Sequence, residues 1–403
     1  MEKDLKIFAS QIDENALMQI EQLMAQPAFA DSKVRIMPDV HAGAGCVIGF
    51  TADLGDKVIP NVVGVDIGCG MLTTQVEGVM DFAKLDAVIR EKIPSGMNAH
   101  DEVHHRFSEL EDLRCREHLR GGDYFERSIG TLGGGNHFIE VDVDDDGDHY
   151  LVIHSGSRNL GKQVADYYQR LAIERHYGSR EEFANRRNQI IRELKEQGRE
   201  KEIGEALAAF ENERSSRERD AQWGIIPKQL CYLTGQDRLD YLHDMQICQR
   251  YASRNRRIMA GIIVDAMDWN CLDVFETIHN YIDMESNIVR KGAVSAWAGE
   301  LLLIPMNMRD GSLICLGKGN DDWNQSAPHG AGRLMSRIEA RKNLSVEDFK
   351  QTMNGVYTTS VSADTIDEAP SAYKPMDAIV PLISDTVEIL NIIRPVYNFK
   401  AAE

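Results

Sequence analysis

The amino-acid sequence predicts an α+β fold in which mixed sheets and flanking helices form a single domain across residues 1–403. Between Val34 and Val76, short apolar runs are broken by Gly, Asp and Pro, a pattern typical of strands joined by turns. A region rich in Arg, Glu, Lys, Gln and Ala follows at residues 160–220, and strand patterns return near Gly311–Leu316. This order differs from the regular strand–helix alternation of a parallel nucleotide-binding sheet.

Local patterns predict the elements of the first half of the chain. The first 30 residues indicate a short strand, followed by an amphipathic helix over Asn15–Met24. Phe138–Val143 and Tyr150–His154 predict a hairpin whose turn is the sequence DDDGD.

The second half is predicted to begin with helices. Residues 160–220 indicate a helical insertion within the domain, made of two helices broken at Gly198 or Gly204. Further helices are expected over Leu239–Met267 and, after a Gly-rich loop, over Gly330–Arg341.

Composition and charge exclude several classes of protein. The 403 residues include 45 basic and 64 acidic side chains, for a net charge of −19, and 43% hydrophobic residues exclude a disordered chain. No stretch approaches the roughly 20 apolar residues of a membrane span, and the acidic start is unlike a signal peptide, so we expect a cytoplasmic protein without a membrane partner. A surface this acidic would bind nucleic acid only through a local basic groove.

Residues with metal-ligand chemistry lie on glycine-flanked loops. VVGVDIGCGM carries Asp66 and Cys69, three positions apart, and both side chains can reach one site. Taken alone, this segment is slightly better read as a tight turn with a buried cysteine. GTLGGGNHFIE carries Asn136, His137 and Glu140 after three glycines, and a binding loop and a structural strand entry are equally good readings.

Three further segments carry histidine, two of them with arginine. In LVIHSGSRNLG, an apolar strand ends at His154 and Arg158 follows, which favours a phosphate-binding role over a structural one. His279 in VFETIHNYID is a weak signal, because a lone histidine in an apolar run is more often a core residue. PHGAGRLMSR places His329 before Arg333 and Arg337, which suits covalent or acid–base chemistry on a phosphate.

Together these side chains suffice for two metal ions. Three imidazoles (His137, His154 and His279), one carboxylate and one thiolate can form two sites if Cys69 bridges them. Such a pair can hold the attacking and leaving oxygens of a phosphoryl transfer. There is no nucleophile elbow, HExxH or CxxC sequence, so serine hydrolases, zincins and zinc ribbons lack support.

The order of these motifs resembles the RtcB-type RNA ligases, in particular their compact bacterial branch. MPDVHAGAG, IPNVVGVDIGCGM, GTLGGGNHFIE, HSGSRNLG, HNY, RKGAVSA and PHGAGRLMSR occur in that family's order. TIDEAPSAYKPMD and the final Lys400 are also similar, so the resemblance runs from about Ile36 to Lys400.

The resemblance implies a GTP-dependent ligase with two Mn²⁺ ions. It would join RNA ends bearing a 3′-phosphate or 2′,3′-cyclic phosphate to 5′-hydroxyl ends, in RNA repair or tRNA splicing. His329 would accept the guanylate, and Cys69 would bridge one metal held by His154 and His279 and another held by Asp66 and His137. The remaining implied contacts are Asn136 on the GTP phosphates, Glu140, Tyr373 and Lys400 in the guanine pocket, Gly330 and Arg333 with the nucleotide, and Arg158, Arg333 and Arg337 on nucleotide or RNA phosphates.

The sequence departs from the family at two places, and two other functions stay open. Trp297 replaces a basic residue, and IPMNMRDGS at Ile304–Ser312 replaces a loop that contacts the nucleotide in the family, which affects the expected nucleotide preference. One alternative is a metal-dependent RNA-end phosphatase or cyclic phosphodiesterase that does not seal. The other is a non-catalytic partner role, against which the complete set of metal and nucleophile positions argues.

Overall fold

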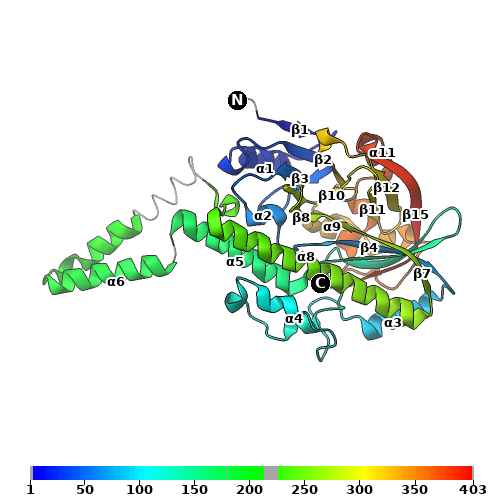
Figure 1. Ribbon diagram of the computed structural model, residues 1–403, viewed down its shortest axis with the longest axis horizontal. Coiled ribbons are helices and arrows are strands. Elements are labelled where there is room, and N and C mark those ends of the chain that lie inside the picture. Colours follow the sequence, from blue (N-terminus) through cyan, green and yellow to red (C-terminus); the bar gives the residue numbers. More distant parts are fainter. Residues whose placement is uncertain (1–2, 179, 213–225, 402–403) are drawn as a thin grey trace.

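The computed structural model describes residues 3–178, 180–212 and 226–401, and it has the α+β architecture that the sequence predicts. Two main sheets face a set of helices, of which α5 (Arg158–Tyr177) and α8 (Gly235–Met267) run side by side across one face (Figure 1). Within these described ranges, no helix is both long enough and apolar enough to cross a membrane.

The larger sheet carries most of the sequence motifs. Its strand order is β11-β12-β15-β5-β6-β4-β7, all antiparallel, with the short β14 added in parallel to the end of β15. The predicted hairpin is confirmed as β5 and β6, joined by the DDDGD turn. The strands are β4 (Gly70–Glu77), β5 (Phe138–Val143), β6 (His149–Ser155), β7 (Asn270–Ile278), β11 (Leu301–Asn307), β12 (Gly311–Gly317), β14 (Tyr357–Thr358) and β15 (Val387–Lys400).

A second sheet and a short ribbon complete the β structure. The five-stranded sheet has the order β1-β2-β3-β9-β8, in which only β1 and β2 are parallel. The ribbon pairs β10 with β13, and β13 ends directly before His329. These strands are β1 (Leu5–Ile7), β2 (Val34–His41), β3 (Ile48–Asp53), β8 (Asn280–Asp283), β9 (Ile288–Lys291), β10 (Ala293–Ser295) and β13 (Ser326–Pro328).

Helix α1 (Glu14–Met24) begins at a capping residue and buries one face. The Asp13 side chain accepts from the Ala16 amide at 2.9 Å, and the buried Ala16, Ile20 and Leu23 share one face, as the predicted helix required. The other helices are α2 (Pro60–Val63), α3 (Phe82–Lys92), α4 (Tyr124–Arg127), α9 (Arg337–Asn343), α10 (Val346–Thr352) and α11 (Met376–Ile383).

Helix α8 links the two large hydrophobic cores. Its first half packs with α5, α1 and the five-stranded sheet through residues such as Tyr241 and Tyr251. Its second half packs with α3 and the larger sheet through residues such as Met259 and Ile263. The prediction of a helix over Leu239–Met267 is confirmed, with a start four residues earlier.

The predicted helical region at residues 160–220 divides into two parts. Helix α5 belongs to the main core, where Leu160, Val164 and Tyr168 are buried. Helix α6 (Arg180–Glu196) and the helical residues 203–212 project away from the body (Figure 1). They are separated at Gly198, whose φ of +69° ends α6 as one of the two predicted breaks. Residues 213–220 of the prediction lie outside the described ranges, and the single-domain assignment stays a prediction.

Candidate active site

Four neighbouring strands of the larger sheet present one candidate ligand each at the same edge. Cys69 precedes β4, which lies between β6 and β7. The register pairs Met71 with His154 on β6 and Gly70 with Ile278 on β7, so His154 and His279 lie on either side of Cys69. His137 precedes β5, whose first residue pairs with His154. The strand register therefore brings together the motifs of Cys69, His137 and His279, none of which clearly indicates a metal site when taken alone.

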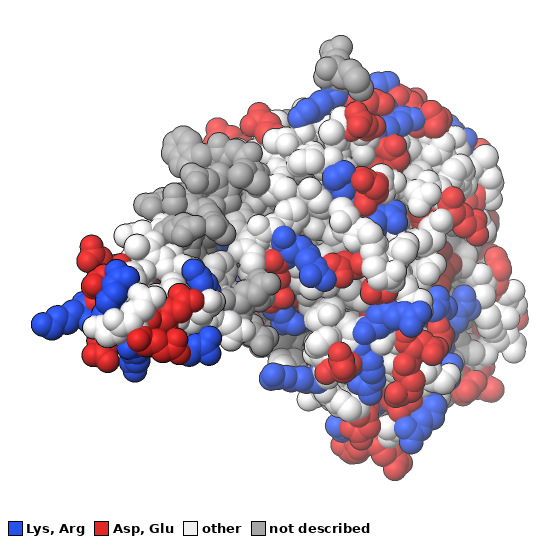
Figure 2. Space-filling view, turned by 60° about the vertical axis from the view of Figure 1, so that its left-hand side comes forward, with Lys and Arg blue, Asp and Glu red and all other residues white. Residues whose placement is uncertain are grey.

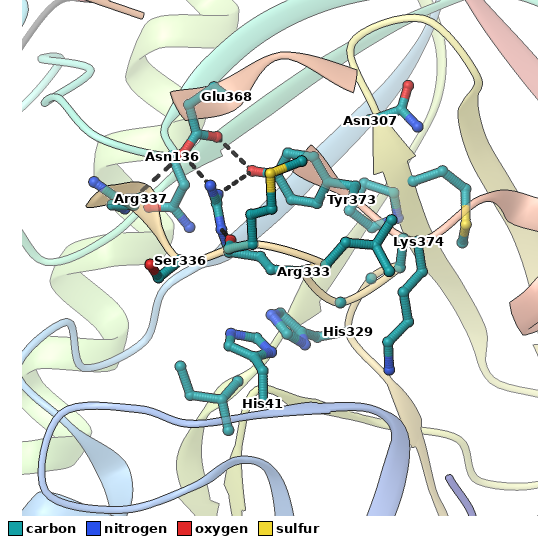
Figure 3. Close-up of a pocket in the computed structure, with 18 of the residues that line it drawn as sticks. His41, Asn136, Asn307, His329, Arg333, Ser336, Arg337, Glu368, Tyr373 and Lys374 are labelled. Atoms are coloured by element: carbon teal, nitrogen blue, oxygen red, sulfur yellow. Dashed lines mark hydrogen bonds and ion pairs between the residues drawn. The ribbon is translucent and has the colours of Figure 1, made fainter. Parts of the chain in front are cut away.

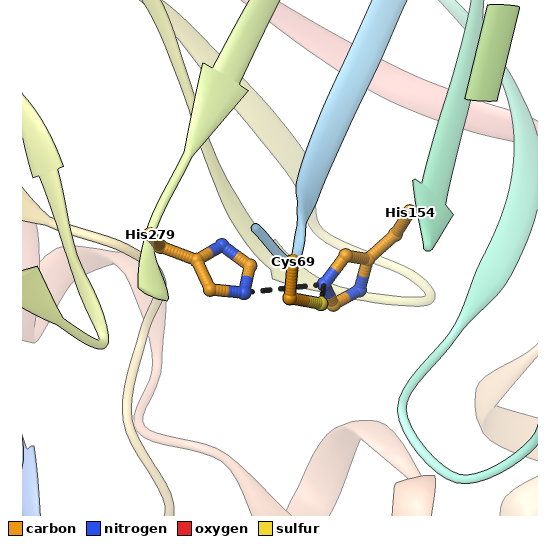
Figure 4. Close-up of side chains that lie close together, drawn as sticks. All are labelled: Cys69, His154 and His279. Atoms are coloured by element: carbon orange, nitrogen blue, oxygen red, sulfur yellow. Dashed lines mark hydrogen bonds between the residues drawn. The ribbon is translucent and has the colours of Figure 1, made fainter. Parts of the chain in front are cut away.

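The donor atoms form two groups that share the Cys69 sulfur. One group is Cys69, His154 and His279, shown in Figure 4, and the other is Asp66, Cys69 and His137; within each group the ligand atoms lie within 4.8 Å of one another. The Cys69 Sγ is 3.3 Å from the His154 Nε2 and 3.4 Å from the His137 Nε2. The Asp66 Oδ2 is 2.9 Å from the His137 Nε2.

The protonation states of these groups suit a bound cation. Burial lowers the pKa of His154 and of His279 well below the usual value, which keeps both imidazoles neutral. Burial opposes ionisation of Asp66, but its hydrogen bond to His137 and the charge of that ring lower its pKa to about 2. Burial raises the pKa of the Cys69 thiol well above its usual value, and a nearby divalent cation is what would favour the thiolate.

The chemistry of the donor set fits two transition-metal ions. The His154 Nδ1 lies 3.1 Å from the Asn136 carbonyl oxygen, and donation there leaves the lone pair of Nε2 facing Cys69 and His279. Imidazole, thiolate and carboxylate donors are ligands of Zn²⁺, Fe²⁺ and Mn²⁺. The structure thus brings together the five residues in the same two groups that the family resemblance implies.

Two buried polar residues of α8 hold the loops that carry these ligands. Arg256 donates to the carbonyl oxygens of Gly68 and Ser155, next to Cys69 and His154, and pairs with Glu276 at 2.9 Å. Asn255 accepts from the amide of Gly130 at 2.7 Å and donates to the Thr131 carbonyl at 3.0 Å. Neither residue is predicted from the sequence, because a polar residue within a long helix carries no local sign of inward orientation.

A cleft of about 1040 Å³ opens above this edge of the sheet. His154, His279 and His329 all line it, and Figure 3 shows His329 next to His41. The His329 ring centre is 5.1 Å from that of His279. A volume of this size is typical of small-molecule and cofactor sites.

The buried carboxylate of Asp39 holds His329 in place. The Asp39 Oδ2 is 2.6 Å from the His329 Nδ1 and accepts from the His329 amide at 3.2 Å. With Nδ1 engaged, Nε2 is the ring nitrogen left for a group in the cleft. His41 stacks nearby, 6.4 Å between ring centres. Asp39 and His41 are not among the site residues predicted from the sequence. Their only signal is the MPDVHAGAG motif, in which both lie.

The opposite wall of the cleft is organised around Glu368. Its carboxylate accepts from the Tyr373 hydroxyl at 2.6 Å, from the Lys400 ammonium, and from the Arg333 Nη1 at 3.3 Å. Arg333 also donates to the carbonyl oxygens of Met335 and Asp367, so its guanidinium secures the loop that follows His329. Arg333, Tyr373 and Lys400 are among the residues predicted from the sequence, whereas Glu368 is not.

The remaining predicted residues occupy different surroundings. Asn136, Glu140, Gly330 and Arg337 line the cleft. Burial raises the pKa of Glu140 above its usual value, and its carboxylate accepts from Asn398. Arg158 instead lies behind the glycine-rich loop, where it donates to the Thr131 hydroxyl at 3.1 Å and to the Gly96 carbonyl at 2.6 Å.

The prediction of a helix over Gly330–Arg341 is wrong for its first half. Residues 330–336 form a loop, and α9 begins only at Arg337, where Ser336 and Glu339 make a capping box. Gly332 has a φ of +76°, and a Cβ there would lie 2.5 Å from the Asp39 carbonyl oxygen. Arg333 forms an isolated bridge with Tyr373. Arg333 therefore lies in the loop, and only Arg337 belongs to the helix.

The two departures from the family pattern differ in their relation to the cleft. Trp297 is 41% exposed and does not line it, whereas Pro305, Met306, Asn307 and Met308 do. Only the second departure therefore changes the cleft wall directly.

Comparison with known proteins identifies the family of this chain. The family model described as tRNA-splicing ligase RtcB matches residues 19–122 and 117–401. RNA-splicing ligase RtcB of Escherichia coli K12 is 30% identical, over 93% of this chain and 92% of the relative. The tRNA-splicing ligases RtcB of Thermococcus kodakarensis and Archaeoglobus fulgidus are 24% and 25% identical, over 87% and 92% of this chain and 83% and 88% of the relatives. The chain therefore belongs to the RtcB family and is an RNA ligase.

Proposed function

We propose that this RNA ligase uses GTP and two Mn²⁺ ions to join 3′-phosphate or 2′,3′-cyclic-phosphate ends to 5′-hydroxyl ends, through a guanylate on His329. The observation that carries the proposal is the position of His329. It lies in a nucleotide-sized cleft, 5.1 Å from a histidine of the Cys69 donor set, with Nδ1 fixed by Asp39.

In the first step, the His329 Nε2 would attack the α-phosphorus of GTP. A P–N bond forms, the bond between the α-phosphorus and the bridging oxygen breaks, and pyrophosphate leaves. The Asp39 carboxylate accepts a hydrogen bond from the Nδ1–H and stabilises the charge that the ring gains during attack.

The two donor groups would hold the metal ions, one with Cys69, His154 and His279 and the other with Asp66, Cys69 and His137. When bound, such ions neutralise phosphate oxygens and orient attacking and leaving groups. Mn²⁺ is proposed from the resemblance, since the donor set alone would bind Zn²⁺ more tightly.

The cleft residues would divide between base and phosphates. Lys400 and Tyr373, on the Glu368 side, and Glu140 would contact the guanine. Asn136 and Arg337 would contact phosphates, while the hydrogen bonds of Arg333 support a role in holding the loop after His329.

The RNA steps follow from the chemistry of the ends. A 2′,3′-cyclic phosphate is first opened by water to a 3′-phosphate. An oxygen of that phosphate attacks the guanylate phosphorus and the P–N bond to His329 breaks. The 5′-hydroxyl oxygen then attacks the RNA phosphorus, a phosphodiester forms, and GMP leaves.

The test is incubation of the pure protein with Mn²⁺ and α-labelled GTP, followed by a denaturing gel. We expect an acid-labile label on the wild type, none on His329→Ala, and less from α-labelled ATP. Labelled protein would next be supplied with a defined RNA pair, and release of GMP with sealing is expected. The protein could instead take no label with any metal or nucleotide, yet still remove the 3′-phosphate or open the 2′,3′-cyclic phosphate of an RNA end. That result would establish the non-sealing phosphatase or phosphodiesterase.

A further inference from the structure

One buried carboxylate, that of Glu368, joins three segments that are far apart in the sequence. Lys400 ends β15, Tyr373 follows a short 3₁₀ turn, and Arg333 lies in the loop after His329. Figure 3 shows Arg333 and Tyr373 directed toward Glu368 at one end of the cleft. The backbone reinforces this arrangement, since the Lys374 amide donates to the Gly332 carbonyl at 3.0 Å and the Leu334 amide to that of Ala372 at 2.8 Å.

The burial of these charges makes Glu368 and Lys400 depend on one another. Lys400 is 7% exposed and Glu368 is 2% exposed. A buried ammonium without a counter-charge is strongly destabilised. Burial opposes ionisation of Glu368, but the charges of Lys400 and Arg333 hold its pKa below the usual value. The carboxylate is therefore ionised and fixes the direction of the Lys400 ammonium.

An ammonium fixed in this way can distinguish purines. It carries only donors, and guanine presents acceptors at O6 and N7 along one edge. Adenine presents an amino group in place of O6, so two donors would meet there. Lys400 discriminates only if its remaining N–H bonds point at the base, which requires that its position be set by another group.

We propose that Glu368 is a positioning residue that sets the preference of the cleft for guanine over adenine by orienting Lys400 and the Tyr373 hydroxyl. The inference rests on the proposed function for the presence of a nucleotide in the cleft. Glu368 acts through its neighbours and is not a catalytic residue. A purely structural role would affect both nucleotides equally, whereas the proposed role changes their ratio.

The experiment is calorimetric titration of the full-length protein with GTP and with ATP, in the wild type and in four variants. Glu368→Gln removes the charge but retains the shape. Asp367→Asn is the matched control, because Asp367 is equally buried and pairs with Arg341 at 3.2 Å. Lys400→Met removes the ammonium that is proposed to contact the base. The fourth variant combines Lys400→Met with Glu368→Gln.

We expect the ratio of the ATP to the GTP dissociation constant to fall at least tenfold in Glu368→Gln and in Lys400→Met. It should stay within twofold of the wild type in Asp367→Asn. Adding Glu368→Gln to Lys400→Met should change the ratio no further, because both act through one ammonium. Thermal unfolding of every variant identifies those that do not fold, and if Glu368→Gln is among them, Lys400→Met decides the question.

Three results would overturn the inference: a wild type that binds both nucleotides equally, a folded Glu368→Gln variant with an unchanged ratio, or a Lys400→Met variant with an unchanged ratio. Failure of the proposed function is distinguishable from these. A wild type that discriminates in binding but takes no label on His329 would contradict the guanylate intermediate and leave the role of Glu368 supported.

Discussion

The Asp39 carboxylate holds His329 in place, and replacement of Asp39 gives the first prediction at the residue scale. Asp39→Asn keeps the size of the side chain but removes the charge that faces the His329 Nδ1 at 2.6 Å. We expect the rate of label transfer from GTP to fall about 100-fold or more, because the ring loses the acceptor that fixes its tautomer and orientation. Initial rates measured at saturating GTP check this.

Asp56→Asn is the control for that variant, since Asp56 is exposed and pairs only with Lys57 among the contacts described. A rate for Asp39→Asn within threefold of the wild type would contradict the role assigned to Asp39. A fall that accompanies an equal loss of folded protein would also contradict it, and circular dichroism measures that fraction.

Cys69 is the only ligand common to both donor groups of the described residues, which gives a second prediction. Cys69→Ala should reduce the binding of Mn²⁺ from two ions to none at concentrations that saturate the wild type, because both sites lose their thiolate. His279→Ala should lose one ion. Equilibrium dialysis with elemental analysis gives the stoichiometry.

Cys46→Ala provides a matched control, because Cys46 is equally buried but lies outside both groups. It should retain two ions. Two equivalents of Mn²⁺ retained by Cys69→Ala would show that the sulfur does not bridge the sites.

At the scale of elements, the sequence predicts those parts that depend on local pattern. The β5–β6 hairpin, α1 and α8 follow from alternation, periodicity and capping, and the structure confirms all three. The sequence predicts a helix over Gly330–Arg341, but residues 330–336 form a loop. It is instead held by contacts with Asp39 and Tyr373, which lie far away in the chain.

The glycine-rich loop before β5 gives the third prediction, which concerns an element and not one side chain. A Cβ on Gly133 would lie 2.0 Å from the Arg158 Nη1 and 2.6 Å from the His137 Nδ1. Gly133→Ala should therefore displace the loop and weaken Mn²⁺ binding at the Asp66–Cys69–His137 group by at least tenfold. Metal titration measures the effect.

Gly147→Ala separates this effect from backbone strain. Gly147 has a φ of +90°, close to the +91° of Gly133, but a Cβ there would meet nothing within 4 Å. Both variants should lose about 1–2 kcal/mol of unfolding free energy through the left-handed conformation, measured by urea denaturation, but only Gly133→Ala should lose metal affinity. Equal metal affinity in the two variants would refute the steric explanation.

At the scale of the whole molecule, the site depends on contacts that no local pattern contains. Asp39 and His329 are 290 residues apart, and Glu368 and Lys400 are 32 apart. The residue types suggest a possible metal set, and the register of four strands is what brings the three histidines next to Cys69. The residues were therefore predictable through the family resemblance, whereas their supporting partners Asp39, Arg256 and Glu368 were not.

The distribution of charge indicates how this acidic molecule would meet RNA. On the face in Figure 2, basic and acidic side chains alternate without an extended basic surface. With a net charge of −19, we expect RNA affinity to come from local basic contacts and not from the overall charge of the molecule.

The projecting helical arm, which consists of α6 and the helical residues 203–212, gives a prediction for the whole molecule. Among the described residues, none of α6 lines the cleft or belongs to either donor group. The arm also leaves and re-enters the body at neighbouring points, because the Tyr177 hydroxyl donates to the Ile226 carbonyl at 2.5 Å. Replacing residues 179–225 with a short Gly-Ser linker should therefore be compatible with the fold.

We expect this deletion variant to take the GTP label at a rate within twofold of the wild type and to unfold at a similar temperature. If the arm binds RNA, the deletion variant should have a higher KM for RNA in the sealing reaction and an unchanged rate of labelling. A loss of labelling in a folded deletion variant would mean that the arm acts on the cleft itself. That outcome would contradict the independence that the separation of α6 from the cleft residues predicts.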